Sequence, residues 1–544
     1  MAKRENWSEL RSLPPEKLAQ ARLALEDIRR GKPVEVALRT HLWRGAPLHK
    51  SALVAAYNEL VRNGEWEADE DLLARIRLKP VRTLSGVTTV TVLTKPYPCP
   101  GKCIFCPDDV RMPKSYLPDE PGAARALENE FDPYRQVTSR LEALTSVGHP
   151  TDKIELLILG GTFSAYRRDY QAWFILRCFQ AMNESHDDTF REDRHRDLPS
   201  LLEALAHEQQ INETAPHRNV GLVIETRPDE ITPAELAWLR TLGVTKVQLG
   251  AQSLDDRILE LNRRGHTVAD LHRAVALLRA GGFKIVLHWM PNLLGATLDS
   301  DHLDFARLWD GLCPDEIKIY PTQLLANAPL YEVWQRGEYR PYTTEELIHL
   351  IADIKPTIPR YCRVNRVIRD IPSTHVVEGN KRTSLRQDVH AELARRGTRC
   401  HCIRCREVRD EPVNPATLQL DDLVYHPDGA EEHFLSFVTP NDKIAGFLRL
   451  SLPKPDSPET GLKDLQGAAI IREVHVYGQS LEVGRERPGA AQHAGLGTRL
   501  LAEAERIARE KGYRRMAVIA AVGTRQYYLE RGFERGELYL VKTL

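Results

Sequence analysis

Short apolar runs alternate with helical segments over residues 81–355, and this alternation constrains the fold more than any other feature of the sequence. The segments between the runs are amphipathic, and the runs themselves lie at 87–94, 154–161, 220–227, 246–253, 284–291 and 316–322. Apolar strands that alternate with helices favour a parallel sheet covered on both faces. We therefore expect an α/β fold with a closed or partial β/α barrel over 81–360, and functional residues at the carboxyl ends of its strands.

Three further segments are expected in a chain of 544 residues, because domains usually hold about 100–200 residues. Residues 1–80 have helical apolar spacing and predict a helical N-terminal region. Residues 361–412 form a basic linker, since 360–409 contain 13 Lys and Arg against 5 Asp and Glu. Residues 413–544 are rich in strands and predict a second α/β domain.

Composition sets broad limits on location and partners. The chain is 42% hydrophobic with a net charge of −1, so it can form a packed core, and any nucleic-acid surface must be local. The longest apolar run, 285–298, contains His and Pro and is too short to span a bilayer. The segment MAKRENWSEL lacks the apolar region of a signal peptide. We expect a cytoplasmic protein with no membrane partner.

A first cysteine cluster follows the first predicted strand, where KPYPCPGKCIFCPDD places Cys99, Cys103 and Cys106 with C-x3-C-x2-C spacing. Clustered cysteines in a chain without an export signal favour metal binding over disulfides. Three thiolates on one loop can hold three irons of a 4Fe–4S cluster, and the open fourth iron can bind S-adenosylmethionine (SAM). A structural zinc site is the alternative, and it requires a fourth ligand.

The cysteine spacing, its position after the first strand and the aromatic Phe105 resemble the radical SAM superfamily. This resemblance implies that Gly160, Gly161 and Thr162, at the end of the second strand, contact SAM. Polar residues at later strand ends are then candidates for contact with SAM or substrate; these are Glu225, Arg227, Gln248 and Gln252. The alternative is that they are solvated residues at the rim of the barrel.

A second cluster, CHCIRC, places Cys400, Cys402 and Cys405 on a short basic segment. Three closely spaced cysteines suit zinc, which takes four ligands in structural sites. Distant Cys313 and adjacent His401 are the candidates for the fourth ligand, and free thiols are the alternative. If Cys313 is the ligand, zinc joins the barrel to the linker.

Near the C-terminus, Gln492-x-x-Gly495-x-Gly497 precedes a predicted helix and follows a strand. Backbone N–H groups at such a helix start bind pyrophosphate, and glycine permits close approach. With GTRQYYLERGF, this pattern resembles the GNAT family of N-acetyltransferases over 413–544. That resemblance implies acetyl-CoA as a cofactor and a tyrosine that protonates its thiolate. Tyr528 matches the position, Tyr527 is the neighbouring candidate, and core packing is the alternative.

Glu473 and His475 lie on the strand before this loop, and either can activate a nucleophile or water. With both of these resemblances and the motif IKIYPTQ, residues 75–544 are similar to the family of Elongator catalytic subunits. This similarity implies that acetyl-CoA and tRNA wobble uridine give 5-carboxymethyluridine by SAM-derived radical chemistry. It also implies that Lys318 and Tyr320 lie in the barrel pocket.

The resemblance implies tRNA as a partner, contacted by 360–409 and, with less support, by 1–80. A homodimer or a larger complex fits the same family. Two other functions remain open from the sequence. A protein lysine acetyltransferase with a structural radical SAM domain needs no SAM for turnover, and a non-catalytic tRNA-binding scaffold needs neither intact cysteines nor an intact pyrophosphate loop.

Overall fold

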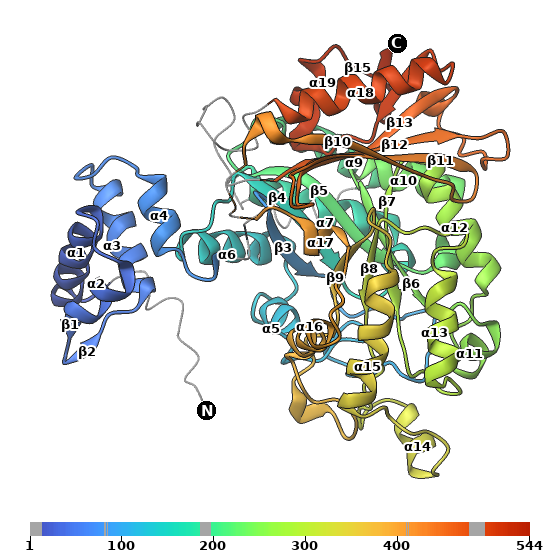
Figure 1. Ribbon diagram of the computed structural model, residues 1–544, viewed down its shortest axis with the longest axis horizontal. Coiled ribbons are helices and arrows are strands. Elements are labelled where there is room, and N and C mark those ends of the chain that lie inside the picture. The colour runs from blue at the N-terminus through green and yellow to red at the C-terminus, as the bar shows by residue number, and fades with distance from the viewer. Residues whose placement is uncertain are drawn as a thin grey trace.

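The computed structural model describes residues 13–80, 83, 85–184, 197–409, 411, 413–477 and 495–544. The expected helical N-terminal region forms a lobe beside the rest of the chain, with a small apolar core of its own (Figure 1). Its elements are α1 (Pro15–Arg29), α2 (Val34–Thr40), β1 (Leu42–Trp43), β2 (Ala46–Pro47), α3 (Lys50–Arg62) and α4 (Glu70–Ile76). None of the described helices is long and apolar enough to cross a membrane.

The alternating region folds into a seven-stranded sheet in which all neighbouring strands are parallel. The strand order follows the sequence and does not close, so the sheet is a partial barrel. The strands are β3 (Thr88–Leu93), β4 (Lys153–Leu159), β5 (Arg218–Thr226), β6 (Lys246–Gln252), β7 (Lys284–Trp289), β8 (Glu316–Ile319) and β9 (Arg363–Arg366). Six of them correspond to the predicted apolar runs, and β9 comes from the segment expected to be a linker.

Helices follow the strands because the outward strand positions are apolar and require cover. In β4, for example, Ile154, Leu156 and Ile158 are buried, whereas the alternate positions face the barrel interior and are half-buried. The helices are α5 (Pro121–Glu128), α6 (Pro133–Thr145), α7 (Arg168–Met182), α9 (Leu198–Asn212), α10 (Pro233–Thr241), α11 (Asp256–Leu261), α12 (Val268–Ala280), α13 (Leu298–Arg307), α14 (Leu330–Gln335), α15 (Thr344–Ile354), α16 (Leu385–Arg395) and α17 (Ile403–Arg406).

The C-terminal part forms a second seven-stranded sheet, of order β10-β11-β12-β13-β14-β16-β15. Only the β13–β14 pair is parallel, and the β12–β13 ladder shifts register between Arg449 and Leu450. The elements are β10 (Gln419–Tyr425), β11 (Ala430–Val438), β12 (Ile444–Pro453), β13 (Ala468–Val476), α18 (Leu496–Glu510), β14 (Arg515–Val518), α19 (Arg525–Leu529), β15 (Glu534–Arg535) and β16 (Leu540–Thr543).

This second domain covers the amino ends of the barrel strands (Figure 1). Arg472 on β13 donates to the carbonyl of Phe283, just before β7, and Arg449 on β12 donates to that of Tyr361, just before β9. One continuous apolar core includes residues of both sheets. The two domains are therefore packed as one body rather than joined by a loose tether.

Buried charges occupy the centre of this interface. Asp315 lies 2.6 Å from Arg472 and 3.4 Å from Arg449, and all three side chains are almost completely buried. Arg472 also lies 3.0 Å from Glu432. Burial alone would raise the pKa of Asp315, but the positive charges of Arg472 and Arg449 hold it well below its usual range. Asp315 is therefore ionised and paired at neutral pH.

We expect Arg472→Met to lower the free energy of unfolding by about 3–5 kcal/mol, because it leaves Asp315 and Glu432 buried with less positive charge beside them. Denaturant unfolding followed by tryptophan fluorescence measures the change. Arg506→Met, which removes an exposed arginine from α18, is the matched control and should leave the unfolding midpoint unchanged. Equal midpoints for the two variants would contradict a structural role of the buried cluster.

Candidate functional site

One cavity of about 810 Å³ extends through the lumen of the partial barrel. The loop of the first cysteine cluster lines one end of it, at the carboxyl ends of the strands. Glu473, His475 and Tyr528 of the second domain line the other end. Residues from two sites that were predicted separately from the sequence therefore line one cavity, although Gly160, Gly495, Gly497 and Tyr527 are not part of its lining.

The loop between β3 and α5 carries Cys99, Cys103 and Cys106 into this cavity. Gly101 donates its backbone N–H to Cys99 Sγ over 3.4 Å, and Arg264 Nη1 lies 3.6 Å from Cys103 Sγ. The pKa of Cys103 is lowered to about 5, first by its hydrogen bond with Cys106 and then by the charges of Arg264 and Arg227, against the effect of burial. The same hydrogen bond, and then burial, raise the pKa of Cys106, so this pair favours a single thiolate at Cys103 beside Arg264.

The arrangement of these sulfur atoms fits a multinuclear cluster better than a single ion. A zinc ion holds all its cysteine sulfurs at about 2.3 Å, so its ligands crowd together. Among the described residues, the three sulfurs of this loop do not gather within 4.8 Å of one another, whereas those of the second cysteine cluster do. A 4Fe–4S cluster places each thiolate on a different iron and accepts the wider spacing.

The glycines predicted to contact SAM follow β4 directly and lie beside this loop. Gly160 has φ +136°, and a β-carbon there would lie 1.8 Å from Thr94 Oγ1, so only glycine fits. Gly161 also has a positive φ and lines the cavity, and Thr162 Oγ1 lies 3.6 Å from Cys99 Sγ. Because Gly160 and Gly161 have no side chains, their backbone is uncovered next to the cysteine loop.

Polar side chains from β5, β7 and β8 form the middle of the cavity. Glu225 accepts a 2.8 Å hydrogen bond from Tyr116 and lies 3.3 Å from Lys318 Nζ. Tyr320 places its ring edge-on to His288, with centroids 5.4 Å apart. Lys318 is buried and has Glu225 as its charge partner. The predicted residues Glu225, Lys318 and Tyr320 are therefore brought together.

The glutamines on β6 also face this region. Gln248 and His288 Nε2 are 2.8 Å apart, and burial lowers the pKa of His288 well below its usual value, so its ring is neutral. Gln252 has φ +70°, and its Oε1 is buried without a hydrogen-bond partner among the described residues. Arg227 Nη1 is likewise unpartnered and points at Gly101 of the cysteine loop. These unsatisfied groups face the space where a ligand would bind.

In the second domain, Gly495 is the N-cap of α18 and has the left-handed conformation, with φ +64°. A β-carbon on Gly497 would lie 2.5 Å from the hydroxyl of Tyr527, so Tyr527 lies against the start of this helix. Tyr528 instead faces the cavity, and burial raises its pKa. Gln492, the remaining predicted pyrophosphate contact, lies outside the described residues.

Glu473 and His475 occupy neighbouring inward positions on β13 but differ in their partners. Glu473 forms ion pairs with Lys284 of β7 and with Arg449 Nε, the latter at 2.9 Å. His475 Nε2 is buried without a partner among the described residues. Burial lowers the pKa of His475 to about 4, so the ring is neutral at physiological pH. His475 therefore keeps a free nitrogen at the cavity.

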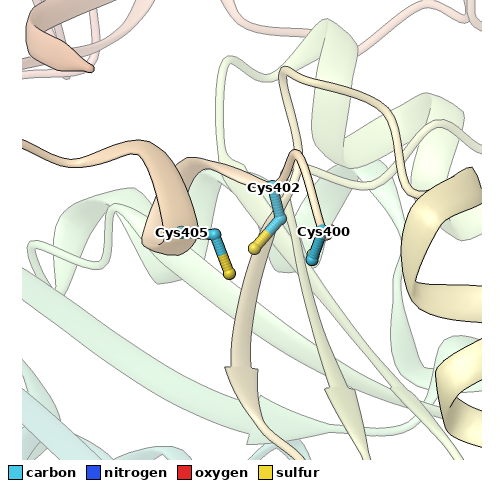
Figure 2. Close-up of side chains that lie close together, drawn as sticks. All are labelled: Cys400, Cys402 and Cys405. Carbon is cyan, nitrogen blue, oxygen red and sulfur yellow. The ribbon is translucent and has the colours of Figure 1, made fainter. Parts of the chain in front are cut away.

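The second cysteine cluster lies beside β9, with the sulfurs of Cys400, Cys402 and Cys405 all within 4.8 Å of one another (Figure 2). The structure does not bring Cys313 or His401 into this group. Cys313 instead donates to the carbonyl of Trp309. The three thiols form a compact ligand set without the expected fourth member.

Two buried residues that the sequence did not single out flank this set. Cys362 accepts a hydrogen bond at its carbonyl from Ile403 N, and its thiol pKa is raised by burial and then by Cys402. Lys355 Nζ is completely buried without a hydrogen-bond partner among the described residues. The pKa of the cluster thiol Cys402 is lowered first by its hydrogen bonds with Cys400 and Cys405 and then, against the effect of burial, by the charge of Lys355. An unpartnered buried ammonium fits a site whose thiolates carry excess negative charge.

Other residues at the main cavity were also missed. Arg264 reaches the cysteine loop from a distant segment, and Tyr116 reaches Glu225 from the loop before α5. Neither has a local sequence signal. His288 does have one, because it occupies an inward position in the apolar run KIVLHW, where a barrel strand normally carries an apolar side chain.

The partial barrel is parallel and carries the cysteine loop, and a GNAT-type sheet covers the amino ends of its strands. These features define a radical SAM enzyme with an acetyltransferase domain. Family models agree: residues 97–306 match the radical SAM superfamily, 314–395 its C-terminal domain, and 403–533 the acetyltransferase (GNAT) family.

Comparison with individual relatives identifies the family within this class. The chain is 41% identical to the tRNA uridine(34) acetyltransferase of Methanocaldococcus infernus over 90% of this chain and 91% of that protein. It is 35% identical to Elongator complex protein 3 of Danio rerio, over 87% of each. A solved structure of M. infernus Elp3 lacking residues 1–46 matches with a TM-score of 0.70 and 37% identity, over 85% of this chain and all of that one. The chain belongs to the family of tRNA uridine(34) acetyltransferases and Elongator complex protein 3.

Proposed function

We propose that this protein converts wobble uridine of tRNA to 5-carboxymethyluridine, using acetyl-CoA and SAM-derived radical chemistry. The observation that supports this most directly is the single cavity lined by both the cysteine loop and the GNAT-type residues. Relatives named for acetylation of tRNA uridine 34 support the choice of substrate. By analogy with relatives named for the Elongator complex, assembly with further copies or subunits is part of the proposal.

In this proposal Cys99, Cys103 and Cys106 hold a 4Fe–4S cluster, and residues 160–162 line the SAM site. The unpartnered groups of Arg227 and Gln252 hydrogen-bond SAM or the sugar that it carries. When bound, the cluster and SAM supply one-electron chemistry that removes a hydrogen atom from carbon. The protein's own contribution is to hold both reactants in one water-poor cavity.

The middle of the cavity is the proposed uracil site. Lys318 offers a hydrogen bond to a carbonyl oxygen of the base. The neutral ring of His288 donates its Nε2–H to Gln248 Oε1, which fixes the ring and leaves Nδ1 to accept the N3–H of the base. Tyr320 provides an aromatic surface against which the base stacks, as is common where proteins bind single-stranded RNA. Glu225 keeps Lys318 charged and in place.

At the other end, His475 is the proposed general base for the water that releases the carboxylate. Its Nε2 is unpartnered and its ring is neutral, so it can accept a proton, whereas Glu473 is held in two ion pairs. Burial raises the pKa of Tyr528, so its hydroxyl stays protonated and can donate to the departing CoA thiolate. Gly495 has open space around its α-carbon and leaves the start of α18 accessible to pyrophosphate, and Gly497 makes room for Tyr527.

Mass spectrometry of tRNA incubated with SAM, a reductant and acetyl-CoA deuterated in its methyl group tests the function. We expect 5-carboxymethyluridine in the tRNA and deuterium in 5′-deoxyadenosine, because a radical on the acetyl methyl is stabilised by its carbonyl. Deuterium that enters 5′-deoxyadenosine only from labelled uridine would overturn the acetyl-radical step. Acetyl transfer to protein lysines without SAM, and no modified uridine, would overturn the function itself.

We propose further that Cys400, Cys402 and Cys405 bind structural zinc. Their sulfurs are close enough for one ion, and buried Lys355 supplies positive charge beside them. Cys362 is the candidate fourth ligand in this proposal: its sulfur lies outside the 4.8 Å group, but its backbone contacts Ile403 within the cluster segment and the charge of Cys402 raises its pKa. Zinc here would fix the connection between β9 and the second domain.

Metal analysis of purified protein should find about one zinc ion per chain, because such sites bind tightly. Cys402→Ala should lose it, since a three-ligand remnant binds zinc poorly, and Cys362→Ala should weaken binding. Cys313→Ala is the control that should retain full zinc. Full occupancy in Cys402→Ala would refute the site, whereas zinc loss in Cys313→Ala would return Cys313 to the ligand set.

The basic segment 360–409 is the proposed tRNA-binding surface, but many of its charges are neutralised within the protein. Arg363 pairs with Glu407, Arg369 with Glu120, and Arg396 with Glu392. More exposed cations remain available for phosphate, above all Lys381, Arg382 and Arg399. We assign the main phosphate contacts to these three.

Replacing Lys381, Arg382 and Arg399 together by Glu should weaken tRNA binding. It should also reduce the slope of log affinity against log salt by about 2–3, because binding releases fewer counterions from tRNA when three phosphate contacts are lost. Filter binding or fluorescence anisotropy over a salt series gives both values. The control replaces Arg506 and Arg509 of α18 and Lys511, which follows that helix, by Glu, an equal change in net charge. The same slope in both variants would disprove this surface.

A further inference from the structure

The two halves of the proposed acetyl-CoA site are held by different parts of the protein. The helix α18, at whose start pyrophosphate would bind, packs on β11, β12 and β13 of its own sheet. The segment 519–539, which carries Tyr528, instead contacts the barrel floor, defined here as the amino ends of the barrel strands and the residues that precede them. The position of Tyr528 therefore depends on residues outside the acetyltransferase domain.

A buried carboxylate of the barrel anchors the start of α19, the helix that carries Tyr528. Glu213 follows α9, precedes β5 and is 3% exposed. Its carboxylate accepts hydrogen bonds from Gln526 over 2.7 Å and from Arg525 over 3.3 Å. Arg535 of β15 donates to both oxygens, at 2.8 and 2.6 Å. One barrel residue thus joins the first turn of α19 to the following strand.

The chain on both sides of α19 along the sequence also contacts the barrel. A β-carbon on Gly523 would lie 2.6 Å from the β-carbon of Arg218 and 2.9 Å from the carbonyl oxygen of the next residue. Only glycine permits this approach to the start of β5. After α19, Leu538 accepts a 2.9 Å hydrogen bond at its carbonyl from Arg240 of α10. The segment is therefore fitted to the barrel on either side of Tyr528.

The anchor requires an ionised carboxylate. Burial alone would raise the pKa of Glu213, but Arg535, then Gln526 and Arg525, hold it below its usual value. Glu213 is therefore charged at neutral pH. A glutamine of the same shape has one acceptor oxygen and no charge, so it cannot hold all three of these side chains.

The helix α19 needs such an anchor because it is short. It spans 5 residues, and a helix of that length has no stability of its own in water. A proton donor must also lie within about 3 Å of the atom that it protonates. The contacts of Glu213 at the first turn of α19 therefore determine where the hydroxyl of Tyr528 lies.

We propose that Glu213 is a positioning residue for thioester hydrolysis, holding α19 so that the hydroxyl of Tyr528 reaches the departing CoA sulfur. This inference rests on the proposed function. In that step water adds to the carbonyl carbon and gives a proton to His475. The carbon–sulfur bond breaks, and the sulfur keeps the electron pair and takes a proton from Tyr528. Glu213 contacts none of the reacting atoms and acts only through α19.

Glu213→Gln tests the inference in the full-length protein, with CoA release from acetyl-CoA in the presence of tRNA followed by chromatography. We expect kcat to fall by about 10–100-fold, because a misplaced proton donor loses most of its effect. The KM for acetyl-CoA should change by less than about 2-fold, since the contacts of α18 are untouched. Formation of 5′-deoxyadenosine from SAM should keep its wild-type rate, because the cysteine loop lies at the other end of the cavity.

Tyr528→Phe separates positioning from a general structural effect. If Glu213 acts through Tyr528, Glu213→Gln should cause no further loss of kcat in the Tyr528→Phe protein, because the proton donor is already absent. Loss by the same factor in both backgrounds overturns the inference. Wild-type kcat in Glu213→Gln or in Tyr528→Phe also overturns it, and so does a raised KM with unchanged kcat.

Gln526→Ala decides the question if Glu213→Gln does not fold. Gln526 is exposed, so its loss leaves the core intact, and kcat should fall by about 3-fold because one hydrogen bond to Glu213 is lost. Wild-type kcat in this variant then overturns the inference. Asp428→Asn is the matched control and should keep wild-type kcat: Asp428 also joins the two domains, through His272 at 2.7 Å, but lies outside the segment 519–539.

The failure of the inference and the failure of the proposed function give different results. Positioning by Glu213 is measured by the release of CoA, whereas the function is measured by the modified uridine. Absence of 5-carboxymethyluridine from the wild-type reaction overturns the proposed function. Wild-type formation of 5-carboxymethyluridine together with unchanged kcat in Glu213→Gln overturns only the role of Glu213.

Discussion

The buried pairing of Asp315 with Arg472 and Arg449 is the interaction on which the rest of the structure depends. It fixes the GNAT-type sheet against the amino ends of the barrel strands. Charges buried at such an interface tolerate little displacement, because each would lose its partner in a low-dielectric region. The pairing therefore sets the alignment of β13 with the barrel floor, and with it the position of Glu473 and His475 at the end of the lumen.

Much of the fold and part of the site follow from local sequence patterns. Six of the seven barrel strands are apolar runs with recognisable spacing, and the cysteine loop and the glycines after β4 are short motifs. β9 was missed because its residues RVNR are polar: the strand lies at the sheet edge and turns Arg363 and Asn365 toward the cavity. The periodicity that predicts buried strands has no signal for such a strand.

Local sequence patterns could not identify contacts between side chains that are distant along the chain. Arg369 and Glu120 are separated by 249 positions, so a count of basic residues in 360–409 overstated the charge available to tRNA. The same limit applies to the second cysteine cluster, where spacing alone suggested Cys313 and His401, while folding places Cys362 and Lys355 alongside. Local spacing identifies three candidate ligands, but only tertiary packing decides which side chains lie beside them.

Neutral imidazoles occupy both ends of the lumen, since burial lowers the pKa of His288 and of His475. A charged ring would add to a cavity lining in which Lys and Arg already outnumber Asp and Glu. A neutral imidazole keeps one nitrogen able to accept a proton or a hydrogen bond, which an imidazolium cannot do. Burial also excludes water, which protects a reactive carbon centre from side reactions. The same burial that keeps the two histidines neutral therefore also shields the chemistry between them.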